Sequence, residues 1–136
     1  LDLSDMKAWW KVEGGLACAT NQLLYNLTRR GIEWDLLPWL RERRVPVMAY
    51  SPIEQGRLLL DPKFAGFSKR HGVTPAQAAL AWLLRRDGVI VMPKTGRRDR
   101  LKENLGALAT PLDAAQLSEL DRMFPPPKRA QPLDML

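Results

Sequence analysis

Val89-Ile90-Val91-Met92-Pro93-Lys94-Thr95-Gly96-Arg97-Arg98-Asp99-Arg100 contains the clearest strand-to-helix signal in the sequence. The apolar residues 89–92 predict a buried strand, and leucines at helical spacing after the arginines predict a helix. Lys94 follows the strand, and the arginines lie where the helix begins. Free N–H groups at a helix start, with cationic side chains beside them, favour an anionic ligand. We therefore expect a strand–turn–helix unit that binds a phosphorylated molecule.

Strand and helix patterns alternate on the N-terminal side of this unit as well. Strands are expected at residues 16–22, 45–50 and 89–92. Two helices are expected in the first part of the chain, from Ser4 to the glycines at 14–15 and from Asp35 to about Arg44. Three more are expected later: one after the capping box Thr74-Pro75-Ala76-Gln77, one after the basic turn at 94–100, and one at 113–124. Residues 51–72 are expected to form a long loop. This order predicts an α/β fold with a parallel sheet buried on both faces.

Composition is typical of a soluble single-domain protein. The chain has 136 residues, and no apolar run approaches the roughly 20 residues that a membrane helix needs. The single cysteine, Cys18, excludes an internal disulfide and is expected to be a buried small side chain. The N-terminus shows no signal-peptide pattern, so we expect a cytoplasmic protein without a membrane partner. The absence of an initiator Met suggests that the sequence was cut from a longer chain.

The net charge of +6 has three possible explanations: a solvated basic surface, a phosphorylated small ligand, or nucleic acid. The five tryptophans lie on helical patterns rather than among the basic residues, so no nucleic-acid partner is expected. The other two explanations stay open. Trp34, Trp39 and Trp82 are expected to pack in the core or between helices, and Trp9 or Trp10 to face a missing neighbour.

Three motifs together resemble those of the aldo-keto reductases. They are Asn21-Gln22, Ala49-Tyr50-Ser51-Pro52, and Pro93-Lys94 followed by Arg100, Glu103 and Asn104. The resemblance covers residues 5–127 and is strongest to bacterial reductases of the 2,5-diketogluconate reductase type. It implies that residues 1–136 form the C-terminal part of a (β/α)8 TIM barrel, namely its last three strands and their helices, with residues 128–136 as a tail. Because three strands cannot close a barrel, it favours a longer native chain over an open sheet.

The resemblance implies that this part of the barrel binds NADP(H). Lys94 and Arg100 would hold the 2′-phosphate, beside Thr95, which keeps the hydroxyl of the serine usual in the family. Glu103 and Asn104 would face the adenine. Each of these residues has a simpler interpretation as a solvent-facing polar side chain near a helix start. The choice of NADPH over NADH rests on Lys94 and Arg100 alone.

The remaining cofactor assignments lie on the two earlier strands. Tyr50 would stack on the nicotinamide ring and Gln22 would hydrogen-bond its carboxamide, although a core tyrosine and a satisfied buried amide are the alternatives. Ser51 and Ile53 match the loop that passes the pyrophosphate. The next residues, Glu54-Gln55-Gly56-Arg57, are bulkier and more charged than is usual in the family.

The tyrosine, lysine, aspartate and histidine that carry the family's catalysis have no counterpart in these residues. His71, the only histidine, is expected at the surface, and Tyr25 lies outside the tyrosine motif. The resemblance thus implies an enzyme that reduces small aldehydes and ketones with NADPH, to which this chain supplies only the cofactor part. The alternative is a non-catalytic binding or structural fragment that assembles as an oligomer. Because an open sheet has two unpaired edges, we expect the isolated chain to self-associate or to need the missing N-terminal half.

Overall fold

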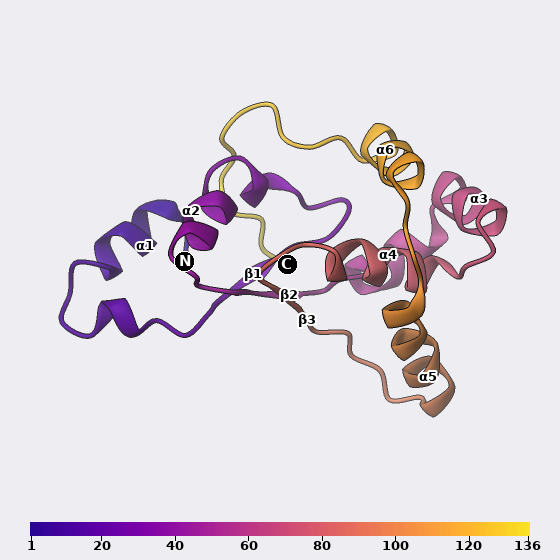
Figure 1. Ribbon diagram of the computed structural model, residues 1–136, viewed down its shortest axis with the longest axis horizontal. Helices are drawn as coiled ribbons and strands as arrows, with labels where there is room; N and C mark the ends of the chain where they lie inside the picture. The colour runs from indigo at the N-terminus through magenta and orange to yellow at the C-terminus, as the bar shows by residue number, and fades with distance from the viewer.

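Three short parallel strands form the sheet of the computed structural model, which describes all residues from 1 to 136 (Figure 1). The strands are β1 (Asn21–Leu24), β2 (Val47–Tyr50) and β3 (Val89–Val91), in the spatial order β1-β2-β3. Leu23 lies opposite Ala49, and Ala49 lies opposite Val91. Helical segments make both connections, as parallel neighbours require. The predicted α/β class and the parallel sheet are confirmed.

Six α-helices surround or extend this sheet. They are α1 (Leu3–Trp9), α2 (Leu36–Glu42), α3 (Pro62–Arg70), α4 (Pro75–Leu84), α5 (Arg98–Gly106) and α6 (Ala114–Met123). Three-residue 3₁₀ turns occupy Gly15–Ala17, Gly31–Glu33 and Ala107–Ala109, and a longer 3₁₀ segment, Glu54–Leu60, is kinked at Gln55 and Gly56. Figure 1 shows α1 and α2 at one end of an elongated molecule and α3, α4 and α5 at the other. No helix combines the length and apolar character needed to cross a lipid bilayer.

Local capping interactions start several of these helices where the sequence predicts. Asp35 accepts a hydrogen bond at the start of α2. Thr74 and Gln77 form the expected capping box of α4, and Asp113 and Gln116 form a second one at α6. Each box satisfies N–H groups that the first helical turn leaves without partners.

The two faces of the sheet differ in burial. Leu23, Val47 and Ala49 are buried, and they belong to one core cluster with Trp82 of α4. The opposite face carries the buried Leu24 and four exposed or half-exposed side chains: Gln22, Met48, Tyr50 and Ile90. The prediction of a sheet buried on both faces is therefore wrong for this chain, as is that of a buried strand at 89–92, where Ile90 is 47% exposed. In a closed barrel this open face would point inward.

The N-terminal elements differ from the predicted ones. Asp2, not Ser4, caps α1, because its carboxylate accepts the Asp5 N–H at 2.8 Å. The helix ends at Trp9 rather than at the glycines, and the first strand begins at Asn21 instead of residue 16. Residues 15–17 form a 3₁₀ turn, so the apolar run there is not extended.

The segment 51–72 is not the expected loop, because it contains the helix α3. Asp61 caps this helix through the Phe64 N–H, and Pro62 occupies its first position. Phe64 and Phe67 are fully buried one turn apart. The cap and the aromatic spacing are both visible in the sequence, whereas Gly66 inside the helix weakens the helical pattern.

The tryptophans have three different environments. Trp82 is fully buried, as expected. Trp39 packs edge-on against Trp10 with 5.3 Å between ring centroids. Trp34 is 50% exposed, so its predicted packing role is wrong, and Trp9 is also about half exposed at 48%.

Two further side chains have environments that the sequence did not predict. Cys18 is only half-buried, with its thiol 3.6 Å from the Thr20 carbonyl oxygen. His71 is not a free surface residue, because its ring packs on Phe67 and contacts the Glu119 carboxylate.

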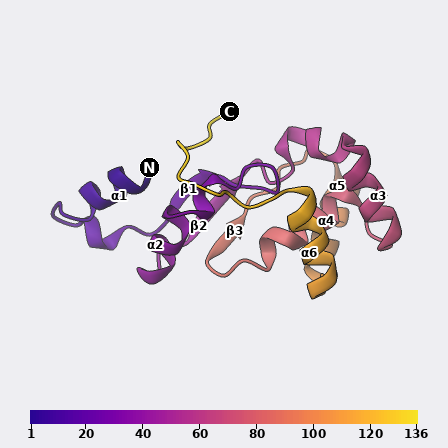
Figure 2. The ribbon, with the colours of Figure 1, turned by 90° about the horizontal axis from the view of Figure 1, so that it is seen from above.

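The C-terminal tail returns from α6 to the β1 end of the molecule (Figure 2). Arg30 anchors the beginning of the tail by donating to the Phe124 carbonyl oxygen at 2.6 Å and to Asp121 at 2.7 Å. Arg29 holds its end through an ion pair with Asp134. The turn that follows β1 therefore fixes the path of the tail.

Candidate functional site

A groove of about 840 Å³ lies between the segments that follow β2 and β3. Ser51 to Ile53 and the 3₁₀ segment after them form one wall, and residues 92–95 with α5 form the other. Pro75 and Ala76, at the start of α4, complete the lining. Both walls follow the carboxyl ends of neighbouring parallel strands, which is where barrels of this class hold their ligands.

Seven of the nine predicted cofactor residues line this groove: Ser51, Ile53, Lys94, Thr95, Arg100, Glu103 and Asn104. The other two, Gln22 and Tyr50, lie outside the lining on β1 and β2. The strand register pairs Gln22 with Met48 and Tyr50 with Leu24, which places Gln22 and Tyr50 on the same, open face of the sheet. The residues expected at phosphate and adenine thus come together, and the two expected at nicotinamide lie apart from them.

The groove is predominantly cationic. Lys94, Arg100 and Arg57 line it, against the single carboxylate of Glu103. Neither Lys94 nor Arg100 has a carboxylate within ion-pairing distance. Their charges are therefore available to an anion from outside the chain.

Arg97 and Arg98, the other two arginines of the basic turn, do not line the groove. Arg97 pairs with Asp99 at 2.6 Å, and its N–H donates to the Thr95 hydroxyl at 3.1 Å. Arg97 occupies the N-cap position of α5, where no side chain caps the helix. The Arg97 side chain therefore accepts no hydrogen bond from the first N–H groups of α5.

α5 is attached to α4 through Gln77. Its side-chain nitrogen donates to the Glu103 carbonyl oxygen at 3.3 Å, while its oxygen serves the capping box. Gly106 allows this approach, because a Cβ there would lie 2.5 Å from the same nitrogen. Gln77 therefore positions the helix that carries Arg100, a role that its local capping motif does not reveal.

The opposite wall has an unusual backbone. Ser51, Glu54 and Gln55 have φ values of 49°, 50° and 55°, and Gly56 follows at 89°. Side chains in this left-handed region cost on the order of 1 kcal/mol each, so other contacts must hold the segment. Asn26 supplies some of them by donating to the Ser51 carbonyl oxygen at 2.9 Å and to Glu54 at 2.8 Å.

Glu54 is the buried centre of this wall. Arg29 donates to its Oε1 from Nη2 at 2.9 Å and from Nε at 3.1 Å. Burial opposes ionisation of Glu54, but the hydrogen bonds from Arg29 and Asn26 outweigh it and hold its pKa below the ordinary value. In the sequence, Glu54 stands out only as one of the residues that are bulkier and more charged than is usual in the family the chain resembles, because Arg29 and Asn26 lie more than twenty residues away.

No tyrosine or histidine lines the groove. The Tyr25 hydroxyl is buried and donates to Glu33 at 2.7 Å, and burial together with the Glu33 charge raises its pKa. No group of three or more His, Cys, Asp or Glu side chains is placed to hold a metal ion. The charges that line the groove therefore suit an anionic ligand.

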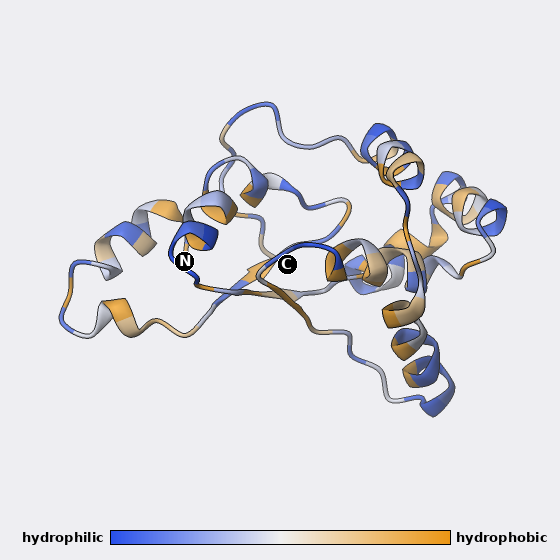
Figure 3. Cartoon of the chain, in the orientation of Figure 1, coloured by the Kyte–Doolittle hydropathy of each residue, from blue (hydrophilic) through white to orange (hydrophobic).

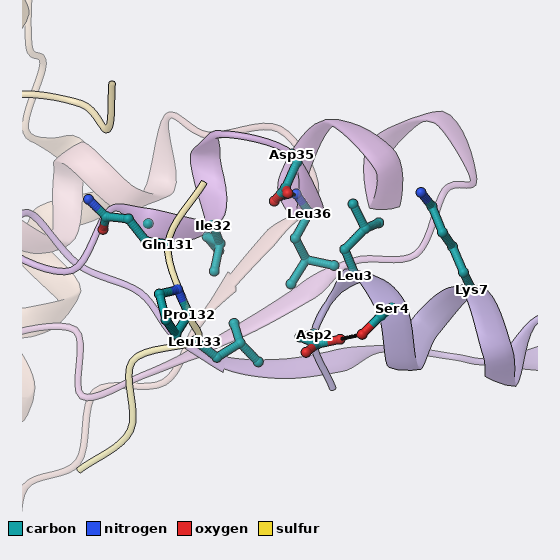
Figure 4. A pocket seen from close by; sticks show the side chains of 11 residues that line it. Asp2, Leu3, Ser4, Lys7, Ile32, Asp35, Leu36, Gln131, Pro132 and Leu133 are labelled. Carbon is teal, nitrogen blue, oxygen red and sulfur yellow. Dashed lines mark hydrogen bonds between the residues drawn. The ribbon is translucent and has the colours of Figure 1, made fainter. Parts of the chain in front are cut away.

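A second hollow, of about 340 Å³, lies between α1, the turn before α2 and the C-terminal tail (Figure 4). Leu3, Ile32 and Leu133 lie toward one another across it, and Ser4 donates to Asp2 at its edge. None of the predicted cofactor residues lines this hollow. We therefore assign the candidate site to the larger groove.

Comparison with known proteins gives a consistent result. Residues 2–124 match the profile of the Aldo/keto reductase family. The chain is 42% identical to methylglyoxal reductase YeaE of Escherichia coli K12 over 141 aligned positions, which cover all of this chain and 50% of that protein. The chain thus spans about half the length of this curated relative.

Solved structures agree with the fold. An aldo/keto reductase from Klebsiella pneumoniae, solved with NADP and acetate, superposes with a TM-score of 0.96 at 43% identity, over 100% of this chain and 50% of that one. A protein assigned as a 2,5-diketo-D-gluconic acid reductase B matches 86% of this chain and 43% of its own, with a TM-score of 0.71 at 29% identity. The three-stranded sheet corresponds to half of such a barrel. The chain belongs to the aldo/keto reductase family and corresponds to its C-terminal half.

Proposed function

We propose that this chain provides the NADP(H)-binding part of an oxidoreductase that reduces small aldehydes or ketones to alcohols. The observation that carries the proposal is the position of Lys94 and Arg100, two cations without ion pairs on one wall of the large groove. The Klebsiella relative that superposes on the whole chain was solved with NADP, which supports the same cofactor here.

The groove residues have distinct proposed roles. Lys94 provides a point charge and Arg100 a planar fork for the dianionic 2′-phosphate, and Thr95 adds a hydroxyl. Glu103 and Asn104 face the adenine from the same helix. On the other wall, Ser51 and Ile53 follow the pyrophosphate.

Tyr50 and Gln22 would meet the nicotinamide on the open face of the sheet. A flat aromatic side chain suits stacking on a flat ring, and an amide suits hydrogen bonding to a carboxamide. When bound, NADPH supplies the hydride. The chain's own residues bind and orient the cofactor.

We expect the 136 residues to have no reductase activity by themselves. Tyr25 is bonded to Glu33, and His71 contacts Glu119, so neither is placed at the groove. A small carbonyl compound is the proposed substrate class of the whole enzyme, in keeping with the name of the methylglyoxal reductase to which the chain is similar.

Isothermal calorimetry with NADP⁺ and with NAD⁺ tests the cofactor assignment. We expect saturable binding that favours NADP⁺, and we expect Lys94→Gln and Arg100→Gln each to reduce that preference about tenfold. Arg98→Gln is the matched control, because it removes one charge from the start of α5 without altering the groove lining. Equal affinity for the two dinucleotides, or an equal loss in the control, would contradict the proposal.

The second candidate, a non-catalytic fragment that assembles as an oligomer, is favoured by the apolar surface at one end of the sheet. The edge strand β3 exposes Ile90, and the next helical segments expose Leu101, Leu105 and Leu108. Figure 3 shows β3 as hydrophobic and α5 as a helix of alternating character. An unpaired strand edge and exposed leucines are both features that favour association.

A further inference from the structure

We propose that Arg57 is a third cofactor-binding cation of the groove, which leaves Glu54 and binds the pyrophosphate when a dinucleotide enters. The inference rests on the proposed NADP(H) function and adds a residue and a group of the ligand to it. Arg57 follows Ser51 and Ile53 along the same wall of the groove.

The contact that holds Arg57 is the weakest of those made by Glu54. Arg57 Nη2 lies 3.3 Å from Oε1, the same oxygen that already accepts two hydrogen bonds from Arg29. A carboxylate oxygen has two lone pairs, so the third donor adds little. The other oxygen accepts from Asn26, and Glu54 therefore stays satisfied when Arg57 moves away.

The Arg57 side chain is also free to move. It is 61% exposed, whereas the Glu54 side chain is 7% exposed. An exposed ion pair contributes roughly 0–1 kcal/mol, so its replacement by a contact to a ligand phosphate is inexpensive. Arg57 is therefore better suited to bind an incoming anion than to stabilise the buried carboxylate.

The position of Arg57 separates it from the other two cations. Lys94 and Arg100 lie on the wall that follows β3, and Arg57 lies on the wall that follows β2, beside Gly56. Gly56 has a φ of 89°, and a Cβ added there would meet no atom within 4 Å. The backbone at Gly56 therefore leaves room for a ligand. NADP carries its negative charge in two separate groups, the 2′-phosphate and the pyrophosphate. The groove offers cations on both of its walls, one wall for each group.

The test compares Arg57→Gln with the wild-type chain in calorimetric titrations of NADP⁺, NAD⁺ and 2′-AMP. Only the two dinucleotides contain a pyrophosphate, whereas 2′-AMP carries the 2′-phosphate alone. We expect Arg57→Gln to lower the affinity for both dinucleotides by about tenfold, so that the ratio of the two affinities stays the same. The affinity for 2′-AMP should not change. Lys94→Gln should instead lower the affinity for NADP⁺ and for 2′-AMP, the two ligands that carry a 2′-phosphate. Arg98→Gln again controls for the loss of one charge.

Each outcome decides between the two proposals. If the wild-type chain binds NADP⁺ preferentially and Arg57→Gln behaves like Arg98→Gln, the Arg57 inference is wrong and the cofactor assignment stands. If Arg57→Gln weakens 2′-AMP as well, Arg57 belongs to the 2′-phosphate and the pyrophosphate assignment is wrong. If the wild-type chain binds none of the three ligands, both proposals fail for this chain. Arg57→Lys and a thermal melt of each variant exclude misfolding as the cause.

Discussion

The side-chain amide of Gln77 on α4 donates a hydrogen bond to the main-chain oxygen of Glu103 on α5. Gln77 also closes the capping box that starts α4. One side chain thus couples the start of one helix to the middle of the helix that carries Arg100. The geometry of the cationic wall depends on this link, although Gln77 itself does not line the groove.

We predict that Gly106→Ala destabilises the chain in spite of the higher helix propensity of alanine. The new Cβ would lie 2.5 Å from the Gln77 nitrogen and force that side chain away from Glu103. We expect a loss of about 1 kcal/mol in the free energy of unfolding, measured by chemical denaturation. Gly66→Ala is the matched control, since its Cβ meets only the tip of Arg70 at 3.5 Å. It should be neutral or stabilising by up to about 1 kcal/mol.

A double mutant separates the clash from other effects of the alanine. Gln77→Ala removes the hydrogen bond and also the atom with which the new Cβ collides. We therefore expect Gly106→Ala to do no further damage in the Gln77→Ala background. Additive losses would show that the two residues are not coupled in the way the structure indicates.

Glu54 gives the chain a pH-dependent contribution to stability. Its pKa is lower in the folded state than in the unfolded state, so the contribution is complete above the unfolded pKa of about 4.3 and is lost as the pH falls through the folded pKa. Glu54→Gln should reduce the free energy of unfolding by about 1–3 kcal/mol at pH 7.

The difference between wild type and Glu54→Gln should shrink in denaturation curves recorded below that pH. Glu13→Gln, in an exposed turn, should match the wild type throughout. A difference that does not depend on pH would mean that packing, and not the charge of Glu54, stabilises the wall.

Arg30 is predicted to hold the C-terminal tail in place. Its guanidinium bonds Glu33, Asp121 and the Phe124 carbonyl oxygen, and it lies 5.0 Å from the centre of the Trp82 ring. Arg30→Met removes the donor to Glu33, Asp121 and the Phe124 carbonyl oxygen, while Glu33 keeps its hydrogen bond from Tyr25, and should cost about 1–3 kcal/mol.

Limited proteolysis measures the effect of Arg30 on the tail directly. Cleavage after Lys128 and Arg129 should accelerate in Arg30→Met, whereas Arg122→Met, which removes only an exposed contact to Ser118, should leave it unchanged. Equal cleavage rates in the two variants would refute the anchoring role.

The exposed edge predicts self-association of the isolated chain. Sedimentation velocity should show an apparent mass that rises with concentration, and Leu105→Glu should reduce it because a charge enters the apolar surface. Leu16→Glu replaces another exposed leucine, near the N-terminus, and should have no effect. A wild-type chain that sediments as one monomer and melts cooperatively would contradict this prediction.

The sequence predicted the starts of several helices correctly, because their capping hydrogen bonds join residues that are close neighbours along the chain. The capping box at Thr74 and the cap at Asp35 need only residues one to three positions away. The groove residues from Lys94 to Asn104 lie within one turn and one helix, so a motif was sufficient to group them.

Distant contacts explain most of what the sequence did not predict. Glu54 depends on Arg29 and Asn26 from another strand connection, and Gln77 depends on a carbonyl oxygen on α5. The open face of the sheet, with Ile90 exposed, cannot be inferred from an apolar run, because such a run does not say what packs against it. The missed cap at Asp61 is different, since that signal was local and was present.

The distribution of the tryptophans has a consequence for spectroscopy. None of the five lines the groove, and Trp82 lies in the core with the guanidinium groups of Arg30 and Arg86 within 5.0 Å of its ring centre. Blue-shifted emission should come from Trp82 and red-shifted emission from the exposed Trp9 and Trp34. Intrinsic fluorescence will therefore report unfolding of the core with high contrast, yet it will respond weakly to an occupied groove.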